Sequence, residues 1–262
     1  MTQHGAQNDI IIEARDILTQ FGDNIVHQDL NFSVRRGEIM GLVGGSGTGK
    51  SVLLNTVLGL KEPEGGGVYI QGRNRADMKP ADREALNNQL GVLFQGGALF
   101  SSLSVRENIM VPMREHTDLP VPLMRELADM KINMVGLPAI AGSLKPSDLS
   151  GGMRKRAGLA RSLALDPAIL FLDEPTAGLD PVGASAFDEL ILNLHGAMGL
   201  TVIMITHDLD SLFRICDRVA VLVDKRIGIN DSLEKVLAYE HPWVQEYFGG
   251  PRSRAALTAG GK

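Results

Sequence analysis

The sequence predicts an α/β fold with a core of parallel strands, an antiparallel β subdomain near its beginning and an inserted helical subdomain. Three observations predict it. The apolar strand at 38–43 runs directly into a glycine-rich loop and a helix, as buried parallel strands do. Short β-favouring stretches separated by turn residues precede that strand. Over about 96–165 the strand signals disappear and helical periodicity takes over, before an apolar strand resumes at 168–174.

The composition is that of an ordinary globular protein and argues against several classes. Apolar residues make up 44% of the 262 positions and charged residues 22%. The net charge of −5 argues against nucleic-acid binding as the main function. The single cysteine, Cys216, excludes an intrachain disulfide framework and fits a reducing compartment. Apolar runs such as 202–205 have the length of strands, so neither a secretory signal nor a membrane-spanning segment is expected.

The N-terminal part is predicted to be a flexible leader at 1–9 followed by antiparallel strands at 10–14 and 25–34, with turn residues at 22–24 between them. Phe21 lies in this region, and its local sequence leaves two interpretations open. It is either a core or turn aromatic or a flat face for an adenine ring, and the local sequence favours the first.

The strongest functional signal is a G-x-x-x-x-G-K-S loop between a strand and a helix. Its glycines let backbone N–H groups point at phosphate oxygens, and the helix N-terminus adds positive potential. We expect Lys50 to reach the terminal phosphates and Ser51 to offer its hydroxyl to Mg²⁺. The flanking strand and helix disfavour the alternative of a glycine-rich turn with a surface lysine. The predicted phosphate-binding residues are Gly44, Gly45, Ser46, Gly47, Thr48, Gly49, Lys50 and Ser51.

Later strands also end in polar side chains, at the edge where open α/β sheets bind ligands. Gln95 follows the strand at 90–94, and a ligand-binding role and a surface-loop role are equally open for it. Asp173 and Glu174 end the next strand. With a phosphate loop upstream, we expect Asp173 in the Mg²⁺ shell and Glu174 orienting or deprotonating the attacking water. His207 also follows a buried strand, so we expect it at the same edge of the sheet. The alternative is a histidine with a purely structural role.

The helical subdomain ends in a serine and two glycines at the start of a basic helix at 154–161. A serine and glycines at a helix start predict a second anion cradle, made by Ser150, Gly151 and Gly152. We interpret the basic residues after them as a solvated helix face. Prolines are expected to break the helices of this region, at positions 112, 120, 122, 138 and 146.

In order, these motifs resemble those of the ATPase subunit of ATP-binding-cassette (ABC) transporters, over about 10–236. The resemblance covers the Walker A loop 44–51, the Q-loop glutamine Gln95, the signature 149–152, the Walker B residues Asp173 and Glu174, the D-loop 177–180 and the switch histidine His207. One departure is Met153, where many members carry glutamine. It lies outside the signature cradle, so we expect little effect on hydrolysis.

The resemblance implies ATP and Mg²⁺ as cofactors and assigns roles to single residues. Phe21 falls at the adenine-stacking position, which reverses the preference from its local sequence. Ser51, Gln95 and Asp173 would hold Mg²⁺. Glu174 would polarise water, and His207 would steady the γ-phosphate. Lys50, Gln95, Glu174 and His207 would be the catalytic residues.

The same resemblance implies a head-to-tail homodimer with two shared sites. Ser150 and Gly152 would cap the ATP bound to the other subunit, with Gly151 and Asp180 also among the nucleotide-binding residues. One phosphate loop and one signature per chain fit this need for a second copy.

A narrower resemblance, to the ATPases of Mce-linked lipid transporters such as the Mla phospholipid system, lies in 94–105, 107–108 and 112–117. It implies an ATPase that drives phospholipids between the inner and outer membranes and maintains outer-membrane lipid asymmetry. The implied partners are a permease dimer, a periplasmic Mce-domain protein and a STAS-domain protein, but no nucleic acid. The ATPase would be peripheral, on the cytoplasmic face of the bacterial inner membrane, and its C-terminal helix and tail at 237–262 would be available for contacts.

Three alternatives remain. The first is the ATPase of a small-solute ABC importer. The second is a soluble ABC ATPase of translation or DNA repair, which the single cassette, the single cysteine and the lack of heptads disfavour. The third is a regulatory subunit that holds ATP without hydrolysis, which Glu174 and His207 disfavour.

Overall fold

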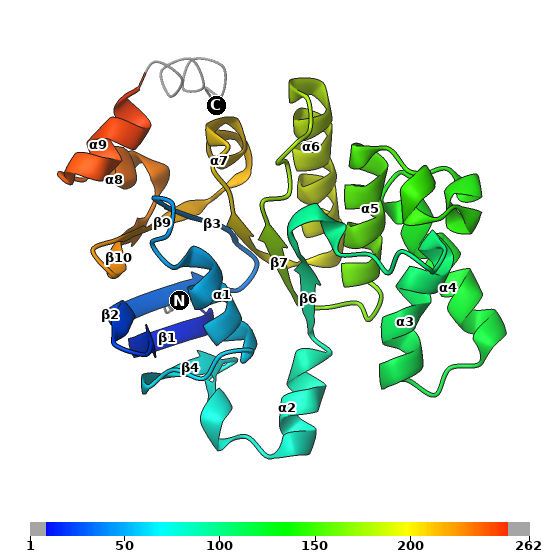
Figure 1. Ribbon diagram of the computed structural model, residues 1–262, viewed down its shortest axis with the longest axis horizontal. Coiled ribbons are helices and arrows are strands. Elements are labelled where there is room, and N and C mark those ends of the chain that lie inside the picture. Colours follow the sequence, from blue (N-terminus) through cyan, green and yellow to red (C-terminus); the bar gives the residue numbers. More distant parts are fainter. Residues whose placement is uncertain (1–8, 251–262) are drawn as a thin grey trace, which may run out of the picture. The chain divides into compact units, whose positions relative to one another are not determined.

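The computed structural model describes residues 9–250 (Figure 1). The chain divides into two compact units. Unit 1 comprises Met1–Glu84 and Thr201–Lys262, and unit 2 comprises Ala85–Leu200. The predicted leader at 1–9 lies, except for Asp9, outside the described residues, and so does the end of the predicted C-terminal segment. The limits predicted for the cassette, 10–236, and for its helical subdomain, about 96–165, stay predictions.

Unit 1 contains an antiparallel sheet, a set of mainly parallel strands and the helices that follow them. Its elements are β1 Ile10–Phe21, β2 Asn24–Arg35, β3 Ile39–Gly44, α1 Lys50–Leu58, β4 Gly65–Ile70, β5 Arg73–Asn74, the 3₁₀ turn Arg75–Asp77, β8 Thr201–Ile205, α7 Leu209–Ile215, β9 Arg218–Val223, β10 Arg226–Asp231, α8 Leu233–Leu237 and α9 Pro242–Gly249. Helix α2, Pro80–Asn87, crosses the boundary between the units.

The antiparallel sheet has the strand order β2-β1-β4-β5, which confirms the predicted antiparallel subdomain. Strands β1 and β2 form a hairpin in which Phe21 pairs with Asn24 across a tight turn. Gly22 in that turn has φ 57°, a backbone region that glycine enters without steric cost. The hairpin turn therefore places Phe21 at the very end of β1.

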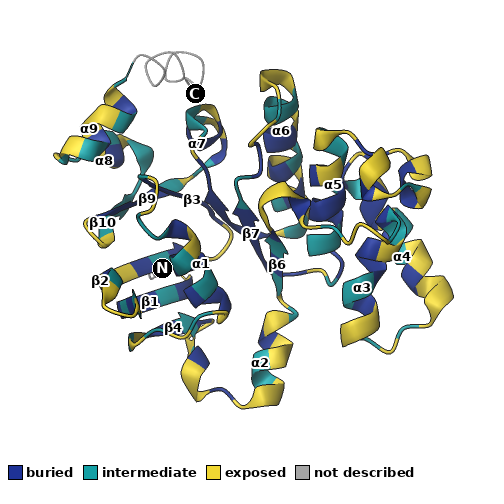
Figure 2. Cartoon of the chain, viewed as in Figure 1, coloured by how far each residue is buried: buried dark blue, intermediate teal, exposed yellow. Residues whose placement is uncertain are grey.

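The parallel strands of unit 1 explain why its functional loops gather at one edge. Strand β3 pairs in parallel with β8 on one side and with β9 on the other. All residues of β3 and β8 are buried, as their unbroken apolar runs predict, and Figure 2 shows β3 and β9 mostly in dark blue. Because the carboxyl ends of parallel neighbours share an edge, the loop after Gly44 and the residues after Ile205 emerge on the same edge.

Strand β10 was absent from the sequence prediction. It pairs antiparallel with β9 through a two-residue turn at Asp224 and Lys225. Both residues have positive φ, 48° and 64°, as a type I′ turn requires. Asn-Gly or Asp-Gly usually marks such a turn, so a sequence with lysine at its second position gives no hairpin signal.

Unit 2 consists mainly of helices that follow and precede a pair of parallel strands. Its elements are β6 Leu90–Leu93, α3 Val105–His116, α4 Val121–Met134, α5 Gly151–Ser162, β7 Ile169–Asp173 and α6 Pro181–Met198, with 3₁₀ turns at Gln95–Gly97, Ala139–Ser143 and Pro146–Asp148. Strands β6 and β7 pair with Leu90 opposite Ile169. Within the described residues 9–250, no strand lies between them in sequence, and no helix is long and apolar enough to span a membrane.

The prediction that proline breaks the helices is correct at four positions and wrong at Pro112. Prolines 120, 122, 138 and 146 lie at the starts of helical segments, where their missing N–H costs nothing. Pro112 instead lies inside α3. The buried residues Val105, Ile109 and Met113 lie on both sides of the proline, and burial of this apolar face keeps the helix continuous.

Candidate nucleotide site

The phosphate loop runs from the last residue of β3 to the first residue of α1. The ammonium group of Lys50 turns back into it and donates to the carbonyl oxygens of Gly44 at 2.8 Å and Gly45 at 2.9 Å. The Thr48 hydroxyl also donates to the Gly45 carbonyl, at 2.9 Å. Lys50 is only 8% exposed, so its charge is held inside the loop. A cavity of about 260 Å³ adjoins the loop, and its lining residues are Val26, Gly47, Gly49, Lys50, Ser51 and Val52.

Gly49 is the N-cap of helix α1 and provides no side-chain cap. Gly49 has φ 104°, and a Cβ there would lie 2.5 Å from Val26 Cγ1 and 2.6 Å from His27 Nε2. Only glycine therefore fits. The first N–H groups of α1 have no capping side chain of their own and carry the positive end of the helix dipole, the usual setting for a phosphate. Ser46 and Gly47 are exposed on the loop, and Ser51 is exposed on the first turn of α1.

His27 supports the loop from behind and was not identified from the sequence. Its side chain is fully buried, and its Nδ1 lies 2.7 Å from the Thr19 hydroxyl. Burial lowers the pKa of His27 to about 4, so the imidazole against Gly49 is neutral near pH 7. A single histidine in a strand gives no sign in the sequence that its side chain packs against the phosphate loop.

Phe21 and His207 are the other predicted site residues of unit 1. The Phe21 ring is 56% exposed, with Lys61 Nζ 4.8 Å from its centroid, so the structure places it as an exposed aromatic face and not as a core residue. His207 is exposed just beyond β8, and its carbonyl oxygen accepts a hydrogen bond from the Tyr247 hydroxyl at 3.2 Å. Both positions leave the side chains accessible.

Unit 2 holds the predicted catalytic carboxylates at the end of β7. Asp173 is the last residue of the strand, and Glu174 follows with φ 49°, an unusual left-handed conformation for a glutamate. Lys155 Nζ donates to the Glu174 carbonyl at 2.8 Å. Burial lowers the pKa of Lys155, while the charges of Glu174 and Asp173 act in the opposite direction. Lys155 therefore fixes the strained backbone of Glu174 and lies close to both carboxylates.

The interpretation of 154–161 as a solvated basic face is wrong for most of its charges. Lys155 is 7% exposed, Arg156 donates to the Val135 carbonyl at 2.7 Å, and Arg161 donates to the carbonyls of Gly97 and Ala98. Arginine and lysine side chains that satisfy backbone carbonyls at loop ends hold those loops in place. The sequence pattern of the helix gave no sign of which carbonyls these were.

The remaining predicted residues lie at the starts of helical segments in unit 2. Ser150 is the N-cap of α5, and its hydroxyl accepts from the Met153 N–H at 3.3 Å. Gly151 and Gly152 form the first turn of α5. Asp180 is the N-cap of α6 and accepts from the Gly183 N–H at 2.8 Å. Gln95 is exposed at the start of the 3₁₀ turn after β6.

The donors predicted for Mg²⁺ belong to both units, Ser51 to unit 1 and Gln95 and Asp173 to unit 2. Their oxygen atoms are of the type that Mg²⁺ prefers. No group of three or more His, Cys, Asp or Glu residues that could hold a metal ion occurs in 9–250. A Mg²⁺ ion that is bound by few protein ligands and by substrate phosphates needs no such group.

Comparisons with known proteins place this site in a family. Residues 27–177 match the model of the ABC transporter family. The chain is 35% identical over 243 residues to "Intermembrane phospholipid transport system ATP-binding protein MlaF" of Haemophilus influenzae, covering 93% of this chain and 92% of that protein. The Escherichia coli K12 protein of the same name is 35% identical over 240 residues, 92% of this chain and 89% of that protein. The "Probable ribonucleotide transport ATP-binding protein mkl" of Mycobacterium leprae is 36% identical over 245 residues, 93% of this chain and 70% of that protein.

Solved structures similar to this chain are also ATP-binding cassettes or parts of ABC transporters. The dimeric ATP-binding cassette MJ0796, bound to ADP and Pi after hydrolysis, has a TM-score of 0.76 at 27% identity and covers 85% of this chain and 98% of its own. CbiO1 of Clostridium perfringens, part of the ABC transporter complex cbiONQ, has a TM-score of 0.79 at 28% identity. The match covers 96% of this chain and 99% of the CbiO1 chain. Fold and site thus define a P-loop ATPase of the cassette type. The chain belongs to the ABC transporter family, and the predicted fold class and ATPase activity are confirmed.

Proposed function

We propose that the residues predicted from the sequence carry out ATP hydrolysis in the roles expected for them. The phosphate loop and Lys50 bind the phosphates, and Phe21 stacks on the adenine. Ser51, Gln95 and Asp173 hold Mg²⁺, which would neutralise phosphate charge. Glu174 takes a proton from the water whose oxygen bonds to the γ-phosphorus as the bond to ADP breaks, and His207 steadies the γ-phosphate. The buried ammonium of Lys50 and the uncapped start of α1 support the phosphate assignment.

We further propose that the active species is a head-to-tail homodimer. Each chain has one phosphate loop and one signature segment, and MJ0796, a structural relative, is dimeric. Ser150, Gly151, Gly152 and Asp180 would then contact the ATP bound to the other copy. Exposure of Ser150, Gly151 and Asp180 at helix starts leaves them accessible to a second chain. Catalysis would depend on closure of the dimer, because only then is the γ-phosphate surrounded.

For the cargo, we propose phospholipid moved between the inner and outer membranes. The observation that carries this proposal is the 35% identity to MlaF proteins of intermembrane phospholipid transport over at least 92% of this chain. The partners would be a permease dimer, a periplasmic Mce-domain protein and a STAS-domain protein, with this ATPase at the cytoplasmic face of the inner membrane. Hydrophobic side chains exposed among the helices of unit 2, such as Phe100 at 52% and Ile140 at 68%, suit contact with a permease.

A second candidate is the ATPase of a transporter for a small polar solute. The 36% identity to a protein named for ribonucleotide transport favours it specifically. The ATPase chemistry would be the same in either case, so the distinction depends on the partner proteins and their cargo.

The deciding experiment is a pull-down of the tagged full-length protein from detergent-solubilised native membranes, with mass spectrometry of proteins and lipids. Membranes with the untagged protein serve as the control. A permease, an Mce-domain protein and enriched phospholipid would support the phospholipid proposal. A permease with a soluble solute-binding protein would instead support the small-solute transporter. Absence of any membrane partner would contradict both.

A further inference from the structure

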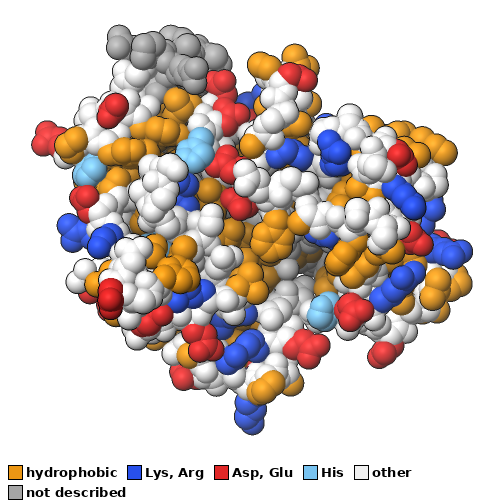
Figure 3. All heavy atoms as spheres, in the orientation of Figure 1, with side chains coloured by type: hydrophobic (Ala, Val, Ile, Leu, Met, Phe, Trp, Pro, Cys, Tyr) orange, Lys and Arg blue, Asp and Glu red, His pale blue; other side chains and the backbone are white. Residues whose placement is uncertain are grey.

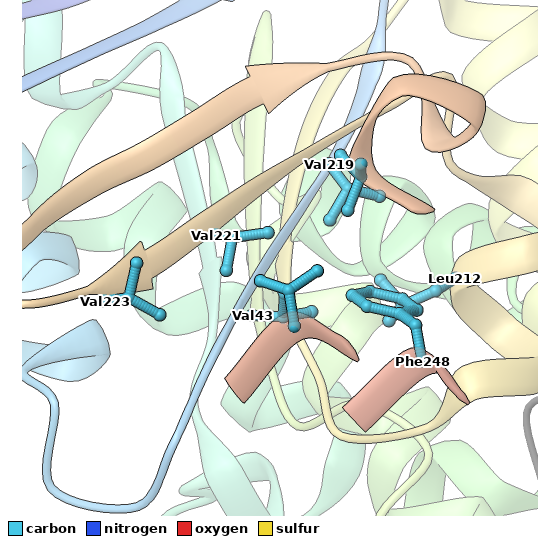
Figure 4. Close-up of a cluster of buried hydrophobic side chains, with 8 residues drawn as sticks. Val43, Leu212, Val219, Val221, Val223 and Phe248 are labelled. Carbon is cyan, nitrogen blue, oxygen red and sulfur yellow. The ribbon is translucent and has the colours of Figure 1, made fainter. Parts of the chain in front are cut away.

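Helix α9 is fixed against the strand that leads into the phosphate loop. Its residues Val244 and Phe248 are buried in a cluster that Val43 of β3 also joins. Figure 4 shows Phe248 directed toward Val43 and Leu212. The remaining buried members of this cluster are Val219, Val221, Val223 and Val236. Since Val43 precedes Gly44 by one residue, burial of this apolar face holds α9 beside the start of the loop.

Trp243 of α9 reaches the loop itself. A Cβ at Gly45 would lie 3.4 Å from Nε1 of Trp243 and 3.4 Å from Cγ2 of Thr48. The indole therefore lies beside the loop, at the distance where a Cβ on Gly45 would be in van der Waals contact with it, and Gly45 is the residue whose carbonyl accepts from Lys50. Hydrophobic side chains gather at the surface over this end of unit 1 (Figure 3).

Tyr247 connects Trp243 to His207. The two rings stack with centroids 4.7 Å apart and planes 14° from parallel. On its other side, Tyr247 meets Phe248 edge-on at 4.9 Å, which couples the pair to the buried cluster. The Tyr247 hydroxyl donates to the His207 carbonyl at 3.2 Å. One turn of α9 thus lies beside the phosphate loop through Trp243 and is hydrogen-bonded to the backbone of His207 through Tyr247, and we assign both segments to the phosphates.

We infer that α9 positions the nucleotide site, with Trp243 holding the phosphate loop and Tyr247 holding the backbone of His207. The inference rests on the proposed roles of these two segments. A glycine-rich loop and the short segment after β8 lose conformational freedom when they bind phosphate. Aromatic rings that already restrict both segments in the free protein reduce the conformational entropy that is lost on binding. Trp243 and Tyr247 are positioning residues, since they act through Gly45 and His207.

The test uses Trp243→Phe and Tyr247→Phe in the purified full-length protein. Tyr247→Phe keeps the ring and removes only the hydroxyl. We expect kcat to fall about 2- to 10-fold with KM for ATP nearly unchanged, because one neutral hydrogen bond on His207 is lost. Trp243→Phe keeps an aromatic ring but shortens its reach to Gly45, so we expect KM for ATP to rise by about the same factor with a smaller change in kcat. Tyr239→Phe is the matched control, because Tyr239 packs on the same cluster.

A spectroscopic signal gives an independent check. Trp243 is the only tryptophan in the sequence, so ATP titration of the wild-type protein should change its emission. Wild-type kcat and KM in both variants, or equal shifts in Tyr239→Phe, would overturn the inference while leaving the ATPase proposal intact. A wild-type protein that neither binds nor hydrolyses ATP would overturn the proposed roles of the loop and His207, and this inference with them.

Discussion

Helices α1 of unit 1 and α5 of unit 2 both begin at glycine-rich segments predicted to bind anions, yet they begin differently. Helix α1 starts after Gly49, with φ 104° and no side-chain cap. Helix α5 starts after Ser150, whose own hydroxyl accepts from the Met153 N–H. In the first arrangement no N-cap side chain occupies the start of α1, whereas in the second the serine hydroxyl accepts from a backbone N–H of its own helix and keeps the serine at a defined position. The α1 terminus is therefore organised for binding, and the α5 terminus for presenting a side chain.

Two buried lysines show the same contrast. Lys50 donates to carbonyls of its own loop, where a phosphate would be received. Lys155 donates to the carbonyl of Glu174, a residue with a strained backbone, and so fixes the backbone of the residue that we propose as the general base. In the proposed mechanism, unit 1 holds the lysine that binds phosphate and unit 2 holds the carboxylate that takes the proton. Substitutions in the two units should separate affinity from turnover.

The largest effect is expected for Glu174→Gln. The amide cannot accept the water proton, so kcat should fall about 10²- to 10⁴-fold, the usual contribution of a general base. The bond from Lys155 goes to the backbone of residue 174 and survives the change, so ATP affinity should stay near the wild-type value. Steady-state ATPase rates and nucleotide titration measure both quantities, with exposed Glu189→Gln on α6 as the control. ATPase turnover close to the wild-type rate would remove Glu174 from its role.

Lys50→Ala should act mainly on ATP affinity, in contrast to Glu174→Gln, which should act mainly on turnover. Loss of a charge-assisted bond to phosphate should weaken ATP binding about 10- to 100-fold. Isothermal titration with ATP measures this, and Lys79→Ala removes an exposed lysine of the same unit as the control. An unchanged ATP affinity would contradict the division of labour between the two units.

Sequence reasoning succeeded where a local pattern determines the structure. The glycine-rich loop between a strand and a helix and the two carboxylates at the end of a buried strand were both predicted, because each depends on residues adjacent in the chain. Lys155 and His27 were missed, because their roles come from contacts with residues 19 positions away at Glu174 and 22 positions away at Gly49. Burial of a single polar side chain against a distant loop leaves no periodic signal.

His27 predicts how acid affects the binding unit. Its pKa is about 4 in the folded protein and 6.5 in an unfolded chain, so the unfolded state binds the proton first as pH falls. Between pH 6.5 and about 4, the free energy of unfolding should decrease by about 3 kcal/mol from this group. Denaturant unfolding across this range measures the loss. His27→Asn, whose δ amide can take the place of Nδ1 opposite Thr19, should show a shallower pH dependence, and an unchanged dependence would assign the effect to other groups.

The smallest effect, Ser150→Ala, has the most closely matched control. Loss of an N-cap costs about 1 kcal/mol of stability, and Ser104, the N-cap of α3 in the same unit, should cost about as much when changed to alanine. If Ser150 also contacts the ATP of a second chain, only Ser150→Ala should lower the ATPase rate as well. Chemical denaturation and ATPase assays of the two variants separate capping from contact. Equal ATPase rates in both would mean that Ser150 only caps its helix, and the proposed contact across the dimer would then be wrong.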